Sequence, residues 1–493
     1  MSDGLRTVLA ELADRMPPAS PGDVWRAGRR MRRRDRLRLA TRLAVVLAVL
    51  VCLVPQVLRY RPLAEPAGGQ AAVPNRVWTP WMWQGTVGQD PNGPATLLFS
   101  GDGLGLRGTD LFDHEGKVAV VGQDGSYRML LYGGAETVAG EAVQISPDGR
   151  YVVQGHLAGA ERGWLVVTDL VDGRSRTVTG PEGRTCCATP LAWAPDGGAV
   201  LAMETSETPV GVDPVTGYVI QPARLVLHDL TTGTSRVLVD ELGDRWKLRT
   251  ASLVAFSPDG RWIAVSQGSR VSLVSRTGAV AWSRDLGPGR HLAGVGAFTP
   301  DGRRIATVTL DGCRDECDSV ALAARTWRFG YLDARTGADG TGAAFGPVTA
   351  MAVRMLGWRL GTDPVVLTYR PEGGARSGPG FNDTGWWEVG DATLVALRPG
   401  GGSEVLVDSP GEVLAMDVPR NLLEAGRFGG PARAPAPLPA RPVALVLAVP
   451  LGLLLIVVGV PLAVLFGSWR RRRSRADGLR HPRPGAGAGG IPA

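Results

Sequence analysis

The residues best suited to chemistry in this 493-residue chain are four cysteines in two close pairs, Cys186–Cys187 and Cys313–Cys317. Closely spaced thiols can ligate zinc or form disulfides. Adjacent cysteines rarely present both sulfurs to one tetrahedral ion, so the spacing favours disulfides over a four-cysteine zinc site. The pairing is left open, because four cysteines allow three pairings, and free thiols are the remaining alternative. The fifth cysteine, Cys52, lies in an apolar stretch.

Other patterns with chemical potential are weak. Residues 311–318 are acidic but lack the ligand spacing of a known calcium loop, which favours a solvated loop. Residues 103–108 match G-x-G-x-x-G by letters, but a dinucleotide site needs a helix after this segment, and a β-rich region follows. The histidines are scattered, and a Ser/His/Asp arrangement assembled only by the fold stays open. They are His114, His156, His228, His291 and His481. We expect no catalytic residue, no metal and no cofactor.

The best candidate for recognition is the segment from Pro371 to Gly385, which is long and rich in glycine and is followed by Trp386 and Trp387. Adjacent residues of a strand face opposite sides, so at most one of the two indole rings packs in a core. The other is available as a platform for a ligand. Packing within or between structural elements is the alternative.

The structural elements that position these candidates are indicated by a short sequence motif that recurs along the chain. In this motif, Pro-Asp-Gly follows Ser, Thr or Ala. Proline presets φ for a tight turn, aspartate tolerates the next position, and glycine accepts a positive φ. Alternating apolar residues on both sides predict the two strands of a hairpin. The copies are Pro147-Asp148-Gly149, Pro195-Asp196-Gly197, Pro258-Asp259-Gly260 and Pro300-Asp301-Gly302.

A second turn signal follows each copy, and the first three of these signals come directly after a clear apolar run, so that one unit contains four strands. Four antiparallel strands per repeat is the unit of a β-propeller blade, whereas a single hairpin turn would fit a β-sandwich equally well. The fold class predicted is therefore all-β, a β-propeller. The second signals are Asp169–Gly173, Asp229–Gly233, Arg276–Gly278 and Asp333–Gly337.

The repeated motif resembles the WD40-like Pro-Asp repeat, the blade type of the TolB family and of propeller domains in some serine peptidases. The resemblance covers about residues 110 to 420. It implies a fold and little about activity, because the shared residues are turn and core positions. Peptidases with this blade type carry their catalytic triad in a separate α/β-hydrolase domain, for which this chain has no room.

The turn signals predict about seven four-stranded blades, and six or eight are also compatible with the spacing. The candidate turns lie near residues 115, 148, 196, 259, 301, 360 and 419. A propeller must close its ring, commonly with a strand from one end of the chain. We expect Val77 to Val87, which contains Trp78, Trp81 and Trp83, to be that strand.

The formal net charge of +7 is unevenly distributed. Residues 1–42 and 470–493 each carry six more arginines than acids, which leaves −5 (7 less 12) for the residues between them. Because the residues between the two tails carry no excess positive charge, nucleic acid is not expected as a partner. Only Lys117 and Lys247 are lysines, while arginine, alanine, glycine and proline abound, which indicates a GC-rich bacterial genome such as that of an actinobacterium.

Two apolar stretches flank the repeats, and each adjoins an arginine cluster. Each is long enough to cross a bilayer, and the clusters predict that both ends of the chain are cytoplasmic. A cleaved signal peptide is the alternative for the first stretch. The expected parts are a basic tail 1–38, a transmembrane helix 39–60, a linker 61–76, an extracytoplasmic propeller 77–426, a linker 427–441, a transmembrane helix 442–469 and a basic tail 470–493.

These observations predict a membrane-anchored binding, scaffold or sensory module of the bacterial cell envelope, without catalysis. The lipid bilayer and an envelope protein, peptide or glycan are the expected partners. A propeller enzyme, a hydrolase or lyase with its site in the central funnel, is the alternative. A propeller released by cleavage of the first apolar stretch is a third.

Overall fold

The structure is a computed structural model, and the part of the chain from residue 71 to residue 435 that it describes lies within one compact unit, Leu63–Pro442. Among the residues described, no helix is long and apolar enough to cross a membrane. The predicted spans 39–60 and 442–469 lie outside the described residues, apart from Gly452. The described residues are 71–80, 84–101, 117–130, 138–155, 164–180, 185–206, 211–212, 219–220, 222–242, 254–377, 389–411, 413–435 and 452.

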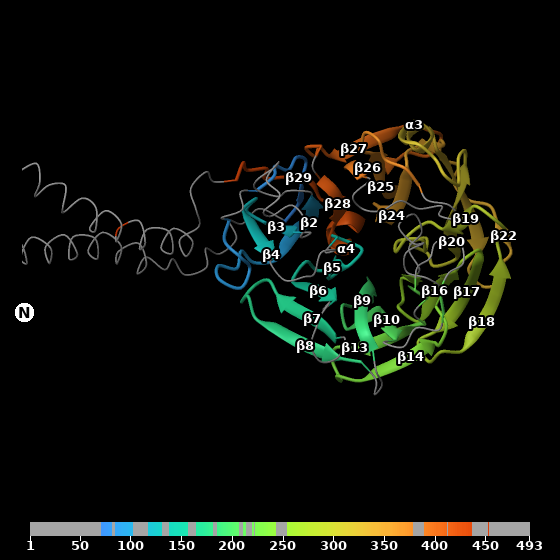
Figure 1. Ribbon diagram of the computed structural model, residues 1–493, viewed down its shortest axis with the longest axis horizontal. Helices are drawn as coiled ribbons and strands as arrows, with labels where there is room; N and C mark the ends of the chain where they lie inside the picture. The colour runs from blue at the N-terminus through green and yellow to red at the C-terminus, as the bar shows by residue number, and fades with distance from the viewer. Residues whose placement is uncertain are drawn as a thin grey trace, which may run out of the picture. The chain divides into compact units, whose positions relative to one another are not determined.

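Within these residues the chain forms six antiparallel sheets, or blades, around a central axis (Figure 1). Each blade places one strand next to the axis and three more in order toward the outside. Blade 1 consists of β28 (Val413–Asp417), β2 (Ala95–Gly101), β3 (Lys117–Gly122) and β4 (Tyr127–Leu130). Blade 2 consists of β5 (Val143–Ile145), β6 (Tyr151–Gly155), β7 (Trp164–Asp169) and β8 (Ser175–Thr179). Blade 3 consists of β9 (Thr185–Trp193), β10 (Ala199–Ser206), β13 (Ala223–Asp229) and β14 (Ser235–Val239).

The remaining three blades follow in chain order. In blade 5 two short segments, β22 and β23, both pair with β21 and share the outermost position. Blade 4 consists of β15 (Val254–Phe256), β16 (Trp262–Gln267), β17 (Arg270–Ser275) and β18 (Val280–Asp285). Blade 5 consists of β19 (Arg290–Leu292), β20 (Arg304–Asp311), β21 (Thr326–Asp333), β22 (Asp339–Gly340) and β23 (Val348–Thr349). Blade 6 consists of β24 (Ala352–Arg359), β25 (Asp363–Pro371), β26 (Val389–Leu397) and β27 (Ser403–Val407).

The recurring Pro-Asp-Gly motif lies between the first and second strands of blades 2, 3, 4 and 5. In the same blades the second turn signal lies between the third and fourth strands. In an antiparallel blade these two connections lie at the same end of the sheet. We call this end of the propeller the turn rim. It carries Pro147–Gly149, Pro195–Gly197, Pro258–Gly260 and Pro300–Gly302.

Side-chain hydrogen bonds fix each of these turns. In blade 2 the hydroxyl of Ser146 donates to Asp148 Oδ1 (2.6 Å) and accepts from the backbone N–H of Tyr151 (2.8 Å). Asp148 Oδ1 also accepts from the N–H of Arg150 (3.0 Å), and Gly149 takes a φ of 76°. Aspartate and serine thus satisfy backbone groups that the tight turn leaves without partners. The same bonds recur around Ser257–Asp259 and Thr299–Asp301.

The ring closes with a strand from the C-terminal part of the chain. β28 pairs antiparallel with β2 and is the innermost strand of blade 1. The turn signals near residues 115 and 419 therefore belong to two halves of one blade. The described residues form six blades, so the expectation of seven was wrong. Counting turn signals in chain order treats the two halves of blade 1 as two separate blades.

The expectation that Val77 to Val87 closes the ring was also wrong. The described residues of this stretch pack beside the outer strands of blades 6 and 1, where Val77 and Val87 are buried in the inter-blade clusters. The N–H of Val77 donates to Asp408 O (3.1 Å), just beyond β27, and Thr86 forms a parallel bridge with Met129 of β4.

Apolar clusters between neighbouring blades hold the ring together. Separate groups of buried side chains join blades 1 and 2, blades 2 and 3, and blades 3 and 4. A further group spans blades 4, 5 and 6, and the largest joins blade 6 to blade 1. Because every blade buries apolar surface against both neighbours, the core is a closed ring of inter-blade contacts.

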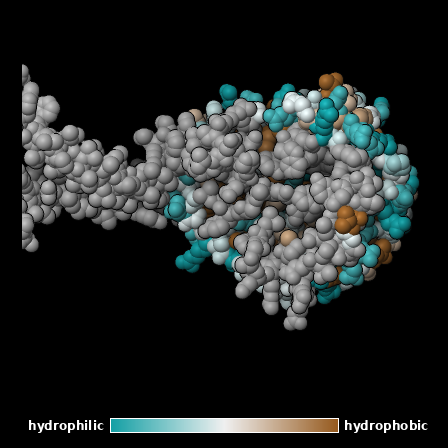
Figure 2. Space-filling model, viewed as in Figure 1, coloured by the Kyte–Doolittle hydropathy of each residue, from teal (hydrophilic) through white to brown (hydrophobic). Residues whose placement is uncertain are grey.

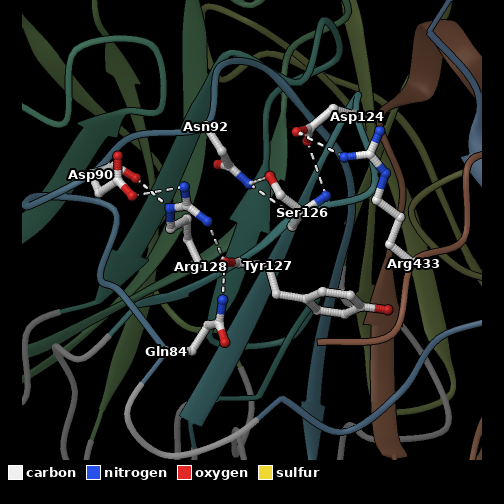
Figure 3. Close-up of polar contacts among 8 residues, drawn as sticks. All are labelled: Gln84, Asp90, Asn92, Asp124, Ser126, Tyr127, Arg128 and Arg433. Carbon is white, nitrogen blue, oxygen red and sulfur yellow. Dashed lines mark hydrogen bonds and ion pairs between the residues drawn. The ribbon is translucent and has the colours of Figure 1, made fainter. Parts of the chain in front are cut away.

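Both ends of the propeller attach to blade 1 at the turn rim. β1 (Val73–Pro74) pairs in parallel with β29 (Phe428–Gly430). Arg433 lies 3.8 Å from Asp124, in the turn between β3 and β4, and Arg128 donates to Asp90 (Figure 3). The incoming and outgoing segments of the chain thus leave the propeller side by side.

Candidate functional site: the insertion rim and the axial channel

The opposite end of the propeller carries the long connections between the second and third strands of the blades. In blade 4 this connection is only Gly268-Ser269. In blades 3, 5 and 6 it comprises residues 207–222, 312–325 and 372–388, and the first contains the hairpin of β11 (Gly211–Val212) and β12 (Val219–Ile220). We call these three segments the insertion rim. Loops presented on a rigid scaffold are the usual place for recognition in such folds.

The insertion of blade 5 is tightly organised. Cys313 and Cys317 form a disulfide with Cα atoms 6.0 Å apart. Helix α3 (Ser319–Ala323) follows, and the side chain of Asp318 caps it by accepting from the N–H of Ala321 (2.8 Å). Two further charged groups of this segment make local contacts, because Asp311 pairs with Arg328 and Arg314 donates to Leu310 O. No group of three or more His, Cys, Asp or Glu side chains placed to hold a metal occurs in the described part of the chain.

A fully buried arginine, Arg325, forms the centre of this insertion. Its guanidinium donates to the carbonyl oxygens of Cys313 (2.8 Å), Met351 (3.3 Å) and Arg314 (3.4 Å) and lies 3.7 Å from Cys317 Sγ. A buried charge is tolerated only where hydrogen bonds replace its hydration, and here the loop carbonyls supply them. Arg325 therefore ties the disulfide loop to the start of blade 6.

The insertions of blades 5 and 6 contact each other directly. The N–H of Cys317 donates to Ser377 Oγ (2.8 Å), and the N–H of Ser377 donates to Cys317 O (2.9 Å). Asp318 and Arg376 form an antiparallel bridge beside them. The disulfide loop thus supports the base of the segment that leads to residues 378–388.

The predicted site residues are placed unevenly. Trp386 and Trp387 lie outside the described residues, as does the side chain of Cys186. Cys187 is a half-buried residue of β9. Arg325 was not recognised from the sequence, and the only signal was a charge directly before a buried strand.

Blades 1 to 6 all contribute to an axial channel that opens toward the turn rim. Its cavity measures about 70 Å³, which holds a few water molecules, whereas sites for organic ligands usually measure about 300–1,000 Å³. Large side chains narrow it. One lining residue from each blade is Asp417, Gln144, Trp193, Phe256, Phe298 and Trp358.

Charged side chains from different blades meet beside this channel. Arg354 of β24 is 2 % exposed and donates to Met416 O of blade 1 (3.1 Å). Asp417 accepts from the N–H groups of Ile145 (3.0 Å) and Val418 (3.1 Å). Burial raises the pKa of the Asp417 carboxyl to about 6, although the nearby guanidinium of Arg354 acts in the opposite direction. These groups link blades 1, 2 and 6 where the ring closes.

The described surface on the face shown in Figure 2 is mainly hydrophilic, with separate hydrophobic residues. Exposed large hydrophobic side chains of the described residues include Val212 and Val320 on the insertion rim and Leu360 on the turn rim. Isolated residues of this kind are normal on soluble surfaces.

Comparison with known proteins identifies no family for this chain. No family model and no curated protein matches the chain. Among solved structures, similar ones include a protein described as TolB from Agrobacterium tumefaciens (17% identity, 46% of this chain and 73% of that chain, TM-score 0.31). TolB from Acinetobacter baumannii shares 14% identity over 61% of this chain and 60% of that chain, with a TM-score of 0.34. An oligogalacturonate lyase in complex with manganese shares 14% identity over 68% of this chain and 78% of that chain, with a TM-score of 0.40. At these values the propeller assignment rests on the strands of the chain itself.

Proposed function

We propose that this chain is a TolB-type propeller anchored in the bacterial cell membrane, which binds an envelope protein, peptide or glycan through its insertion rim, and that no reaction is catalysed at this rim. It acts there as a scaffold or as a sensor. Both ends of the chain are cytoplasmic and the propeller is extracytoplasmic, as the arginine clusters beside the two apolar stretches predict. An actinobacterial source fits the composition.

The observation that carries this proposal is the contact between the insertions of blades 5 and 6. Two insertions about 60 residues apart in the chain are held together through Cys317 and Ser377. These contacts restrict the freedom of residues 312–325 and 372–377, which lowers the entropic cost of binding to them. The fully buried Arg325 and the disulfide stabilise this base further.

The two ends of the propeller lie next to each other, which fits a chain with one anchor on either side of the propeller in sequence. The segments that lead to the two apolar stretches leave the propeller side by side through β1 and β29, at the turn rim. Since the residues between the basic tails carry a net charge of −5 out of the total of +7, nucleic acid is an unsuitable ligand.

A propeller hydrolase or lyase is the alternative, and one observation favours it. Arg354 of blade 6 interacts electrostatically with Asp417 of blade 1 and with Glu141 of the connection that leads to β5. Against it, the adjoining cavity of about 70 Å³ has no room for a sugar or peptide.

The proposal is tested by shortening the insertion rim. Residues 372–388 of the full-length protein are replaced by Gly-Ser, the connection that blade 4 uses between β16 and β17. Envelope components that co-purify with the detergent-solubilised wild type should be lost from this variant, while its thermal unfolding changes little. Retention of the same components by the shortened variant would contradict the proposal.

A further inference from the structure

A serine, a histidine and a glutamate meet at the outer part of the junction between blades 2 and 3. Ser235 Oγ of β14 lies 2.9 Å from Nδ1 of His228, its cross-strand neighbour on β13. His228 Nε2 lies 3.3 Å from Glu204 Oε1 of β10. His228 and Glu204 are each 1 % exposed, whereas Ser235 is half-buried on the outermost strand.

The remaining contacts define the direction of the hydrogen bonds. Arg224 donates to Glu204 Oε2 through Nη2 (2.9 Å) and Nε (3.2 Å), so this oxygen is occupied. Glu204 Oε1 and His228 Nε2 are both buried, and neither makes a hydrogen bond among the described residues, although they lie 3.3 Å apart. The negative charge of the carboxylate at this distance favours the tautomer with its proton on Nε2, which leaves a lone pair on Nδ1 facing the Ser235 hydroxyl.

The surroundings hold this group in place. An added Cβ on Gly180 would lie 2.2 Å from Glu204 Oε1, so the backbone of blade 2 packs directly against the carboxylate. Thr179 O lies 3.1 Å from Ser235 Oγ and is a second acceptor for the hydroxyl proton. Ser235 is thus positioned between a carbonyl that restrains it and an imidazole that can act as its base.

We propose that Ser235 is a nucleophilic serine, with His228 as its general base and Glu204 as the group that orients the imidazole and stabilises its protonated form. The electrophile it would take is an activated acyl donor such as an ester. Oγ forms a bond to the carbonyl carbon while its proton passes to His228 Nδ1. The bond to the leaving group breaks with its electron pair, and the leaving group takes the proton from His228. This site is separate from the insertion rim and does not depend on the proposed binding function.

The neighbouring blade supplies a matched control. In blade 2, Ser175 occupies the equivalent position on the outermost strand and pairs across β7 with Thr168, whose hydroxyl lies 2.8 Å from Ser175 Oγ. The two serines share strand position and cross-strand pairing, but only Ser235 faces an imidazole. General-base assistance is commonly worth about 10²-fold or more in rate.

The test measures covalent labelling of the full-length protein in detergent by a fluorophosphonate probe, with the modified residues located by mass spectrometry. Ser235 should be labelled about 100-fold faster than Ser175. In His228→Asn, which keeps a hydrogen-bond acceptor near Nδ1 but removes the base, the rate at Ser235 should fall to that of Ser175. Glu204→Gln should lower it by an intermediate factor, with unchanged circular dichroism.

Equal labelling of Ser235 and Ser175 in the wild type would overturn the proposal. So would a rate at Ser235 that is unaffected by His228→Asn while the variant keeps its wild-type circular dichroism. If His228→Asn fails to fold, the comparison of Ser235 with Ser175 in the wild type decides alone.

Discussion

Two glycines of the repeated turn give a matched test of how the ring is closed. Gly149 and Gly197 have φ values of 76° and 71° and occupy the same position in blades 2 and 3. A β-carbon at Gly197 would meet nothing within 4 Å. At Gly149 it would lie 2.3 Å from Ala95 O and 3.1 Å from Pro419 Cγ, on the two chain segments that meet in blade 1.

The magnitudes follow from these surroundings. Gly197→Ala forces a side chain into the left-handed region and should cost about 1–2 kcal/mol. Gly149→Ala has the same cost, and in addition the clash must displace β2 or strain the hydrogen bond from Ala95 N to Gly149 O (2.8 Å). Overpacking of this kind typically adds about 1–3 kcal/mol. Gly149→Ala should therefore be the more destabilising by about 1–3 kcal/mol.

The assay is urea unfolding of the full-length protein in detergent, followed by the fluorescence of its 14 tryptophans. Thermal unfolding provides a second measure, in which 1 kcal/mol corresponds to about 1–2 °C for a domain of this size. Equal losses in the two variants, or a larger loss in Gly197→Ala, would refute the account of blade 1 as the closing blade packed against the turn of blade 2.

Three further predictions concern single groups. Burial raises the pKa of Asp417 from 3.8 to about 6, so its contribution to stability is complete below pH 3.8 and is lost as the pH rises through 6. Between pH 4 and pH 8 the free energy of unfolding of the wild type should therefore fall by about 3 kcal/mol relative to that of Asp417→Asn. Denaturant unfolding of both proteins measures this difference. Leu360 is 67% exposed and has a φ of 52°, a backbone conformation that asparagine tolerates better than leucine. Leu360→Asn should therefore raise the free energy of unfolding by up to about 1 kcal/mol in the same assay. A destabilised variant would show that the leucine side chain makes a contact that the fold needs. Reduction of the Cys313–Cys317 disulfide should accelerate tryptic cleavage after Arg314 and leave cleavage after Arg150 unchanged, whereas equal acceleration at both would indicate global unfolding.

The local features of the fold could be predicted from the sequence because they depend on neighbouring residues. Ser146 and Asp148 satisfy the backbone within five residues, and the composition of the turn reflects this directly. The blade count could not be predicted in the same way. β28 pairs with β2 across some 300 residues, and each half of the closing blade resembles a degenerate blade when read alone.

The same distinction applies to the candidate sites. The close pair Cys313 and Cys317 is evident in the sequence, but the contact of its loop with Ser377 depends on the neighbouring blades being adjacent in the ring. The group of Glu204, His228 and Ser235 gave no signal, because three different strands of blade 3 bring it together. Periodicity predicts which residues face inward, but not which polar side chains meet across strands.

The central claim is that the insertion rim is the recognition surface, and site-specific photo-crosslinking tests it most directly. A photoreactive amino acid replaces either Val320 of α3, which is 76% exposed on the insertion rim, or Val280 of β18, which is 62% exposed on the outer strand of blade 4. In cells that produce the full-length protein, we predict a discrete adduct with an envelope component from position 320 and none from position 280. The same adducts from both positions, or an adduct from position 280 alone, would contradict the account.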